Sequence, residues 1–342
     1  MKNFSFILVI LISISLTTDG YSCCNTKFCK LFKTTVFKLN NDVIKRRKDP
    51  SSDKRYTNGL AFGYISTDIK KYSKIFNNCP FIDKFGDKVY TSIHLNHDIY
   101  TPDEIEDTIP QEDQHPYSGE LNFTFGLHGN NSYKLLGHNT PTLLSLSLGL
   151  GATGKYSLAK NIQTGFHGLT ENDLPLGWDN QLPSHFVGKL SGSIISKCDP
   201  ITIKDTSVEV LVNIGGDVGN TLRQGTAGIE LRIGWNIPND YGTYALDSGS
   251  FVSNLQNENS LIYDTTRYGL HMLLYARGKY VDYNYHIGEI VSPTREIAEL
   301  GIGFGLSLHK YKFTIMYITQ SEQFEEQNGP HKFGSFTLTY AR

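Results

Sequence analysis

The stretch LSLSLGL at residues 144–150 places leucine at every second position, with serine or glycine between. Successive side chains of a β-strand point to opposite faces, so this alternation predicts a strand with one bulky face and one small or polar face. The same alternation recurs at 121–127, 229–235, 302–308 and 335–340. No helical apolar period is sustained after the first two dozen residues, which indicates an all-β protein.

Weaker alternating segments bring the expected number of strands to twelve, an even number. Several reach the roughly 9–11 residues with which a tilted strand crosses a membrane, and closure into a barrel leaves no unpaired edge in lipid. The expected strands cover 31–40, 56–66, 88–99, 117–127, 142–152, 184–196, 206–216, 225–237, 266–285, 295–308, 310–320 and 332–341. The sequence therefore predicts a twelve-stranded antiparallel transmembrane β-barrel of the outer-membrane type, formed by one domain over residues 23–342.

Alternation alone does not say which face points outward, so a soluble sandwich or a lipocalin-like barrel remains an alternative. The second face is dominated by Gly, Ser, Thr and Asn, with occasional charges. This composition is typical of the lumen of a membrane barrel rather than of a charged face turned to water, and it favours the membrane barrel. One feature departs from that class, because bacterial barrels usually end on an aromatic residue and this chain ends on Arg342.

The N-terminus has the pattern of a secretory signal peptide over residues 1–22. Lys2 precedes an apolar run over residues 4–16, and small and polar residues follow at 17–22. No later run reaches about 18 apolar residues, so no helical membrane span is expected. The formal charge is -2, so the chain lacks the excess of basic residues that is typical of a nucleic-acid binder. Together with the barrel pattern, export predicts a location in the bacterial outer membrane.

Four polar clusters interrupt the alternation, at 41–42, 53–59, 100–119 and 161–182. Each lies on or beside a connection from an odd strand to an even strand, and in an up-and-down barrel all such connections share one rim. Since the N-terminus of such barrels faces the periplasm, this rim is expected to be the outer one, which carries the longer loops. The clusters are therefore predicted to form one site with access to the outer leaflet.

Within the last cluster, Gln163 and His167 are four residues apart, a spacing that puts both on one face of a short helix. A histidine near neutrality can deprotonate water, so His167 is the candidate general base. Asp42 and the neighbouring amide of Asn41 are candidate oxygen ligands for a hard cation such as Ca²⁺. The alternative is structural: a lone histidine is commonly hydrogen-bonded in the fold, and an Asn-Asp pair at a strand end commonly makes a turn.

At these clusters the chain resembles the outer-membrane lipid A 3'-O-deacylase (LpxR) family, from about residue 37 to the C-terminus. The matching strings are NDVIKRRKDPSSDKRYTNG (41–59), DIYTP (98–102), DQHPYSG (113–119) and NIQTGFHGLTENDLPLGWDNQL (161–182). The resemblance implies a twelve-stranded barrel that removes the 3'-linked acyloxyacyl chain from lipid A of the outer leaflet by calcium-dependent ester hydrolysis. It further implies these active-site residues, with His167 as the base and Asp42 and Asn41 as metal ligands: Asn41, Asp42, Thr57, Gln163 and His167.

Two positions depart from the family pattern. Asp173 stands six residues after the histidine, where the family can have a glutamate, and the resemblance implies a role in substrate binding. The family's active-site lysine, expected shortly after the YTP segment, has no counterpart. Acidic residues stand there instead, at Asp103, Glu104, Glu106 and Asp107. This substitution raises a second interpretation, a catalytically lapsed barrel that acts as a lipid-binding or structural outer-membrane protein.

The tryptophans and cysteines give further expectations. Trp178 and Trp235 are either anchors in the aromatic belt at the membrane interface, the favoured interpretation, or ordinary packing residues. No cysteine spacing suggests zinc. All five cysteines, Cys23, Cys24, Cys29, Cys79 and Cys198, belong to the inner end of the barrel by strand parity, and the connection 67–88, long for a periplasmic turn, carries Cys79. We therefore expect Cys79 or Cys198 to form a disulfide within that group.

Overall fold

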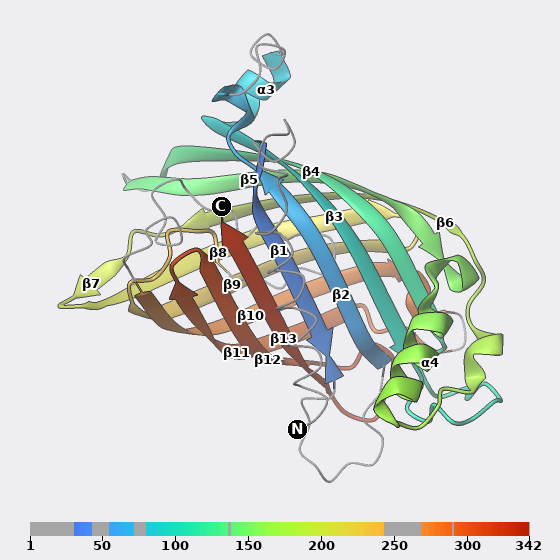
Figure 1. Ribbon diagram of the computed structural model, residues 1–342. Coiled ribbons are helices and arrows are strands. Elements are labelled where there is room, and N and C mark those ends of the chain that lie inside the picture. Colours follow the sequence, from blue (N-terminus) through green and yellow to red (C-terminus); the bar gives the residue numbers. More distant parts are fainter. Residues whose placement is uncertain are drawn as a thin grey trace.

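The computed structural model describes residues 31–42, 55–71, 80–135, 138–242, 268–288 and 291–341, and its strands close into a barrel (Figure 1). Every strand pairs antiparallel with its neighbours, and the pairs β6–β8 and β1–β13 close the ring. The strands are β1 (Phe32–Asn41), β2 (Arg55–Ser66), β3 (Lys88–Thr101), β4 (Ser118–Leu135), β5 (His138–Thr153), β6 (Phe186–Lys197), β7 (Ile201–Ile203), β8 (Thr206–Gly219), β9 (Leu222–Trp235), β10 (Tyr268–Asn284), β11 (Glu296–Leu308), β12 (Tyr311–Gln320) and β13 (His331–Ala341).

Twelve of these strands form the ring, which confirms the predicted twelve-stranded barrel. The thirteenth, β7, pairs only with the first residues of β8 and projects from the barrel as a short hairpin. Its three residues are all exposed and too few to show an alternation, so no periodicity in the sequence predicts it. The largest error in strand bounds is at β4, which continues to Leu135, eight residues beyond the expected end.

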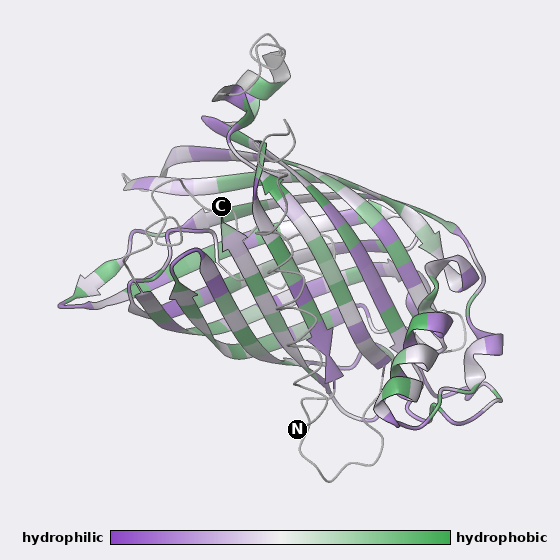
Figure 2. Cartoon of the chain, viewed as in Figure 1, coloured by the Kyte–Doolittle hydropathy of each residue, from purple (hydrophilic) through white to green (hydrophobic). Residues whose placement is uncertain are grey.

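The bulky face of each strand points outward and the polar face lines the interior. Phe123 and Phe125 on β4 are half exposed, whereas Asn122 and Thr124 between them are buried. Inside, the Asn96 amide of β3 donates to both Asn122 and Thr124 at 3.0 Å. Figure 2 shows the resulting alternation of hydrophobic and hydrophilic residues along the strands of the wall. An outward apolar face, a polar lumen and backbone pairing around a closed ring are what a lipid-embedded barrel requires.

The helices lie at the two ends of the barrel. They are η3 (Ile69–Lys71), α3 (Pro80–Phe85), η5 (Gly154–Ser157), α4 (Ala159–Thr170), η6 (Gly177–Asn180) and η9 (Tyr285–Ile287). Among the described residues, none of these helices has the length and apolar character needed to span a bilayer.

When β7 is left out of the count, β10 is the ninth strand of the ring and β13 the twelfth. Contacts between connections then confirm that those leading from an odd to an even strand of the ring meet at one rim, here called the outer rim. Ser118 Oγ, at the start of β4, lies 2.8 Å from His286 Nδ1 in the connection after β10. The Leu182 amide, before β6, donates to the Tyr117 carbonyl oxygen at 2.9 Å. The Arg55 guanidinium, at the start of β2, donates to the Gly329 carbonyl oxygen before β13 at 3.2 Å. Segments separated by up to 274 positions therefore share this end of the barrel.

At the opposite, inner end, the segment after β9 folds back into the lumen. Asp240 is fully buried, receives a 2.6 Å hydrogen bond from Arg232 Nη1 and pairs with the Lys312 ammonium. The neighbouring Tyr241 hydroxyl donates to Asn130 Oδ1 at 2.5 Å. These contacts tie the connection to the inside of β4, β9 and β12 and fill the lumen there.

Cys198 lies at this inner end as a free, exposed thiol, so the expected disulfide does not involve it. The signal peptide at 1–22 and the other cysteines, Cys23, Cys24, Cys29 and Cys79, lie outside the described residues.

Candidate active site

The candidate site lies on the outside of the barrel wall, where β3 approaches the outer rim. Along β3, Leu95 is exposed on the outward face, but the next residues of the same parity, His97, Ile99 and Thr101, are buried. The cover comes from the connection between β5 and β6. The His97 Nε2 donates to the Ser157 carbonyl oxygen at 3.0 Å, and Ala159 packs with Ile99 in one apolar cluster. Helix α4 and η5 therefore cover the outer face of the wall.

Helix α4 holds the predicted pair on its buried face. Ala159, Gln163 and His167 follow one another at intervals of four residues, and they are the buried residues of the helix. The first packs close to β4, since a Cβ at Gly119 would meet the Ala159 Cβ at 2.4 Å. The helix ends at Glu171, whose left-handed conformation (φ 56°) lets its amide cap the His167 carbonyl. The prediction that Gln163 and His167 share one helical face is confirmed.

The imidazole of His167 is oriented by a backbone carbonyl. Its Nδ1 lies 2.5 Å from the carbonyl oxygen of Asp173, and a carbonyl oxygen can only accept, so Nδ1 carries the proton. In the neutral ring Nε2 then keeps its lone pair, which is the tautomer that a general base needs. The Asp173 side chain is exposed. Asp173 therefore takes part in this site through its main-chain carbonyl group.

Gln163 is held by an indole. The Trp178 Nε1 donates to Gln163 Oε1 at 2.8 Å, and Trp178 is completely buried. The ring of Trp178 also packs on Tyr117 at 4.8 Å between centroids, and the Tyr117 hydroxyl donates to the Ile105 carbonyl oxygen at 2.7 Å. Trp178 is a packing residue of the site, and its favoured assignment to the aromatic belt is wrong. Trp235, by contrast, is half exposed at the inner end of β9.

The other predicted residues lie where β1 and β2 reach the same rim. The Asn41 Nδ2 donates to the Thr57 carbonyl oxygen at 3.2 Å, across a strand pair in which Asn41 faces Asn58. A register shift between Tyr56 and Asn58 sets Thr57 apart from the regular ladder to β3, and its hydroxyl lies 2.6 Å from that of Thr101. Thr101 was not predicted as a site residue, although it falls in the matching string at 98–102.

Strand β3 connects the two groups of residues. Its Thr101 contacts Thr57, and its His97 and Ile99 support the segment that carries Gln163 and His167. Asn41, at the end of β1, shares the outward parity, because the adjacent Asn40 points inward and donates to the Tyr56 hydroxyl at 3.2 Å within the lumen. The predicted residues thus gather at the outer rim of the wall.

The oxygen atoms near Asn41 fit a hard cation in their chemistry. Asp42 is fully buried. Its neighbour in the chain, Asn41, donates to the Thr57 carbonyl oxygen, and the Thr57 hydroxyl lies 2.6 Å from that of Thr101. Ca²⁺ binds carboxylate, amide, carbonyl and water oxygens together, so it needs no cluster of acids. Over the described ranges, no group of three His, Cys, Asp or Glu side chains is arranged to hold a metal ion. The Asp42 carboxylate and the Asn41 amide thus have the oxygen chemistry that a hard cation such as Ca²⁺ prefers.

The loop 102–117 lies at the same rim and carries several acidic residues. Asp103 Oδ2 lies 3.4 Å from the buried Arg55 guanidinium, and the Asp103 amide donates to Gln114 Oε1 at 2.9 Å. Deeper in the loop, His115 stacks on Tyr100 with ring centroids 5.2 Å apart. Burial, with smaller contributions from nearby His286 and Arg55, lowers the pKa of His115 to about 3, although the hydrogen bond to the Pro116 carbonyl opposes the shift. His115 is therefore neutral at physiological pH and belongs to the packed base of the loop.

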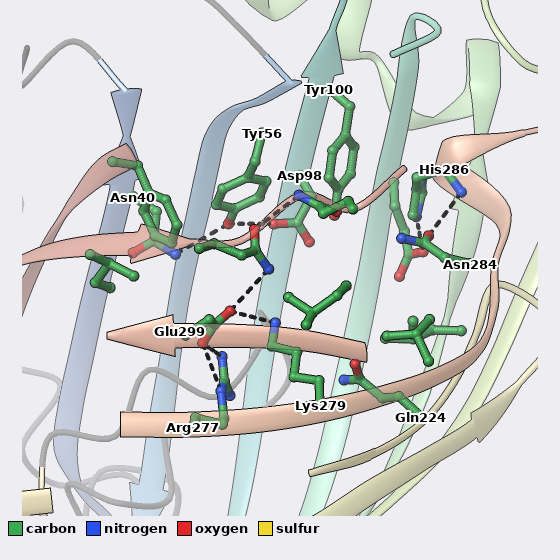
Figure 3. A pocket seen from close by; sticks show the side chains of 18 of the residues that line it. Asn40, Tyr56, Asp98, Tyr100, Gln224, Arg277, Lys279, Asn284, His286 and Glu299 are labelled. Carbon is green, nitrogen blue, oxygen red and sulfur yellow. Dashed lines mark hydrogen bonds and ion pairs between the residues drawn. The ribbon is translucent and has the colours of Figure 1, made fainter. Parts of the chain in front are cut away.

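A second, separate cavity lies inside the barrel below the outer rim, with about 880 Å³ of atom-free space that is partly open to solvent. Figure 3 shows its polar lining, in which Glu299 meets Arg277 and Lys279 at the wall, with Lys279 at 2.6 Å. On the other side, His286 Nε2 lies 3.0 Å from Glu120 Oε2. Gln163 and His167 do not line this cavity. The candidate active site and the lumen are therefore on opposite sides of the same wall.

Comparison with known proteins agrees with this architecture. The family model described as "Outer membrane protein LpxR" matches residues 6–342. LpxR from Salmonella typhimurium superposes with a TM-score of 0.70 at 15% sequence identity, over 90% of this chain and 100% of that chain. The β domain of the Bordetella autotransporter BrkA is more distant, with a TM-score of 0.44 and 12% identity over 91% of this chain and 100% of that chain. No curated protein matches the sequence. On the family match over nearly its whole length, the chain belongs to the LpxR family of outer membrane proteins.

Proposed function

We propose that this outer-membrane barrel is a lipid A 3'-O-deacylase, which hydrolyses the ester of the 3'-linked acyloxyacyl chain with His167 as the general base. The observation that carries the proposal is the His167 imidazole, buried under α4 with Nδ1 bound to the Asp173 carbonyl. That bond leaves Nε2 to accept a proton. A hydrolytic water held at Nε2 would lose its proton to the imidazole as it attacks the ester carbonyl.

The other residues of the proposed site hold its reactive groups in position. Trp178 fixes the Gln163 oxygen, which turns the amide NH₂ group of Gln163 to other partners at the site. The pairs Asn41 with Thr57 and Thr57 with Thr101 hold the opposite side of the site to three neighbouring strands. Groups that are pre-oriented in this way lower the cost of reaching the transition state, because they need no reorganisation during the reaction.

Calcium would be held by Asp42 and Asn41, whose oxygen atoms have the chemistry that this ion prefers. When bound, the ion supplies positive charge that stabilises a developing oxyanion. Asp42 is a fully buried acidic residue of this part of the site. Removing its charge should therefore weaken calcium binding more than removing the charge of an exposed acidic residue at the rim.

The location of the site supports a lipid as the substrate. The site lies on the outward face of the wall, the face that is apolar along the rest of β3 and β4, and it lies at the outer rim. An ester in the outer leaflet reaches such a site without leaving the membrane. Lipopolysaccharide is the substrate class that the family resemblance implies, and its lipid A part carries the ester.

The direct test is mass spectrometry of lipid A from cells that produce the wild type or His167→Ala. We expect the wild type to remove the 3'-linked acyloxyacyl chain and His167→Ala to leave lipid A intact, with the variant barrel still heat-modifiable on gels. The matched control is His309→Asn, in the turn between β11 and β12 at the inner end, where the left-handed conformation (φ 52°) tolerates asparagine. Deacylation by His167→Ala would contradict the assignment of the base.

A second candidate function is a lapsed enzyme that retains lipid binding or a structural role. It is favoured by the acidic loop, where Asp103 faces Arg55 and no lysine follows the YTP segment. The same mass spectra separate the two functions. Unchanged lipid A in cells with abundant, folded wild-type protein would support the lapsed enzyme.

A further inference from the structure

The segment that carries the candidate base also exposes a large apolar surface. Six large apolar side chains of the connection between β5 and β6 are at least 45% exposed. They are Tyr156, Leu158, Ile162, Leu169, Leu174 and Leu176. So many exposed apolar side chains on one loop mark a surface that meets another apolar phase rather than water.

Within helix α4, apolar and polar side chains lie on different faces. Ile162, Phe166 and Leu169 are spaced by four and three residues and form one apolar flank of the helix. Lys160, Asn161 and Thr164 form the opposite flank, which is polar. The buried face with Gln163 and His167 lies between the two flanks against the wall. The helix is therefore amphipathic in addition to having a packed face.

The apolar flank lies at the same rim as the end of the lipid-facing wall. On β5, Leu146, Leu148 and Leu150 are exposed and lead along the strand toward η5, and on β6 Phe186 is 68% exposed at the same rim. The helix lies outside the ring of strands, at its outer rim (Figure 1), and contacts the outward faces of β3 and β4. Its ribbon carries both hydrophobic and hydrophilic stretches (Figure 2).

We propose that the apolar flank of α4, together with Tyr156 and Leu158, is a membrane anchor that sits among the acyl chains of the outer leaflet. Two lysines complete the pattern of an interfacial helix. Lys155 is exposed beside Tyr156, and Lys160 on the polar flank reaches the exposed Asp179 at 2.6 Å. Interfacial helices place apolar side chains about 5–10 Å into the boundary between head groups and acyl chains and keep lysines in the head-group layer. The anchor rests on the barrel's place in the membrane and is independent of the hydrolytic activity proposed above.

The proposal is tested by one tryptophan placed on each flank. Leu169→Trp and the matched Asn161→Trp are made in a Trp235→Phe background, which leaves the buried Trp178 as a common signal. Each protein is reconstituted in phosphatidylcholine vesicles with or without lipid brominated on its acyl chains. At the depth of an interfacial helix, we expect bromolipid to reduce the added emission of Leu169→Trp by about twofold or more and to leave Asn161→Trp nearly unchanged. Aqueous iodide should show the opposite preference.

Quenching of Leu169→Trp by iodide and not by bromolipid would overturn the anchor. Equal bromolipid quenching of both variants would also overturn it, because the proposal requires one flank to be in lipid and the other in water. Heat-modifiable migration checks that each barrel is folded. If Leu169→Trp does not fold, Ile162→Trp on the same flank provides the same comparison, with the same outcomes.

Discussion

The indole Nε1 of Trp178 donates a 2.8 Å hydrogen bond to Gln163 Oε1, one turn of α4 before His167. Trp178→Phe retains an aromatic ring against Tyr117 but removes the donor. Loss of one such hydrogen bond costs about 0.5–1.5 kcal/mol, so we expect kcat to fall by roughly 2- to 10-fold. Trp235→Phe, half exposed at the inner end, is the control.

Because Trp178 acts through Gln163, the effect should appear in kcat with little change in KM. Deacylation kinetics on lipid A in mixed micelles separate the two parameters. A raised KM with unchanged kcat would show that the indole supports substrate binding and not the orientation of Gln163.

The pair of buried hydroxyls on β2 and β3 gives a second prediction. Thr57 Oγ1 lies 2.6 Å from Thr101 Oγ1, and both residues are almost inaccessible to solvent. Thr57→Val keeps the shape and leaves the Thr101 hydroxyl without this partner, at a cost of about 1–3 kcal/mol. We expect Thr57→Val to lose most activity and to unfold at a lower temperature on gels, whereas Thr57→Ser retains both. Equal behaviour of the two variants would exclude a role for the hydroxyl.

Calcium dependence tests the fully buried Asp42. Asp42→Asn preserves the size of the side chain and removes its charge, and a calcium ligand without its charge binds more weakly. We expect the calcium concentration for half-maximal deacylation to rise by about tenfold or more. Asp113→Asn, an exposed acid of the same rim, is the control and should shift this concentration little. If both titrations match that of the wild type, Asp42 is not a calcium ligand.

Acidification should loosen the loop 102–117 through His115. Because burial holds the pKa of His115 at about 3, below its ordinary 6.5, the open loop binds a proton more readily than the packed loop between these values. A depressed pKa of this kind contributes stability that is fully present above pH 6.5 and is lost as the pH falls toward 3. The loss is at most about 1.4 kcal/mol for each pH unit.

Hydrogen exchange of the amides in 102–117 at pH 7 and pH 4.5, corrected for intrinsic rates, measures this effect. Protection should fall at the lower pH in the wild type. His115→Phe keeps a ring to stack on Tyr100 but cannot titrate, so its protection should change much less. An equal loss of protection in both proteins would assign the pH effect to another group.

The wall of the barrel could be predicted because its pattern is local. At 121–127 the alternation that separates Phe123 and Phe125 from Asn122 and Thr124 is also the separation between lipid and lumen. The spacing of Gln163 and His167 was equally local, since four residues make about one turn of a helix. Strand β7 was missed because three exposed residues carry no periodicity.

The side of the wall on which the site lies could not be predicted. His97 and Ile99 continue the outward parity of Leu95, and only the fold of the distant segment 154–182 over β3 turns them from lipid-facing into buried residues. The same long-range packing buries Trp178, for which an anchor in the aromatic belt was the favoured interpretation. Strand parity gave the correct rim, but it carries no information about which connection folds over the exterior.

If the site under α4 hydrolyses lipid A as proposed, its position outside the ring of strands lets the substrate enter sideways from the leaflet and not through a pore. Encounter then depends on how many substrate molecules occupy each unit area of the bilayer, rather than on how many are suspended per litre. Diluting lipid A with inert phospholipid, at a fixed total amount of lipid A, should therefore slow turnover in proportion to its falling mole fraction.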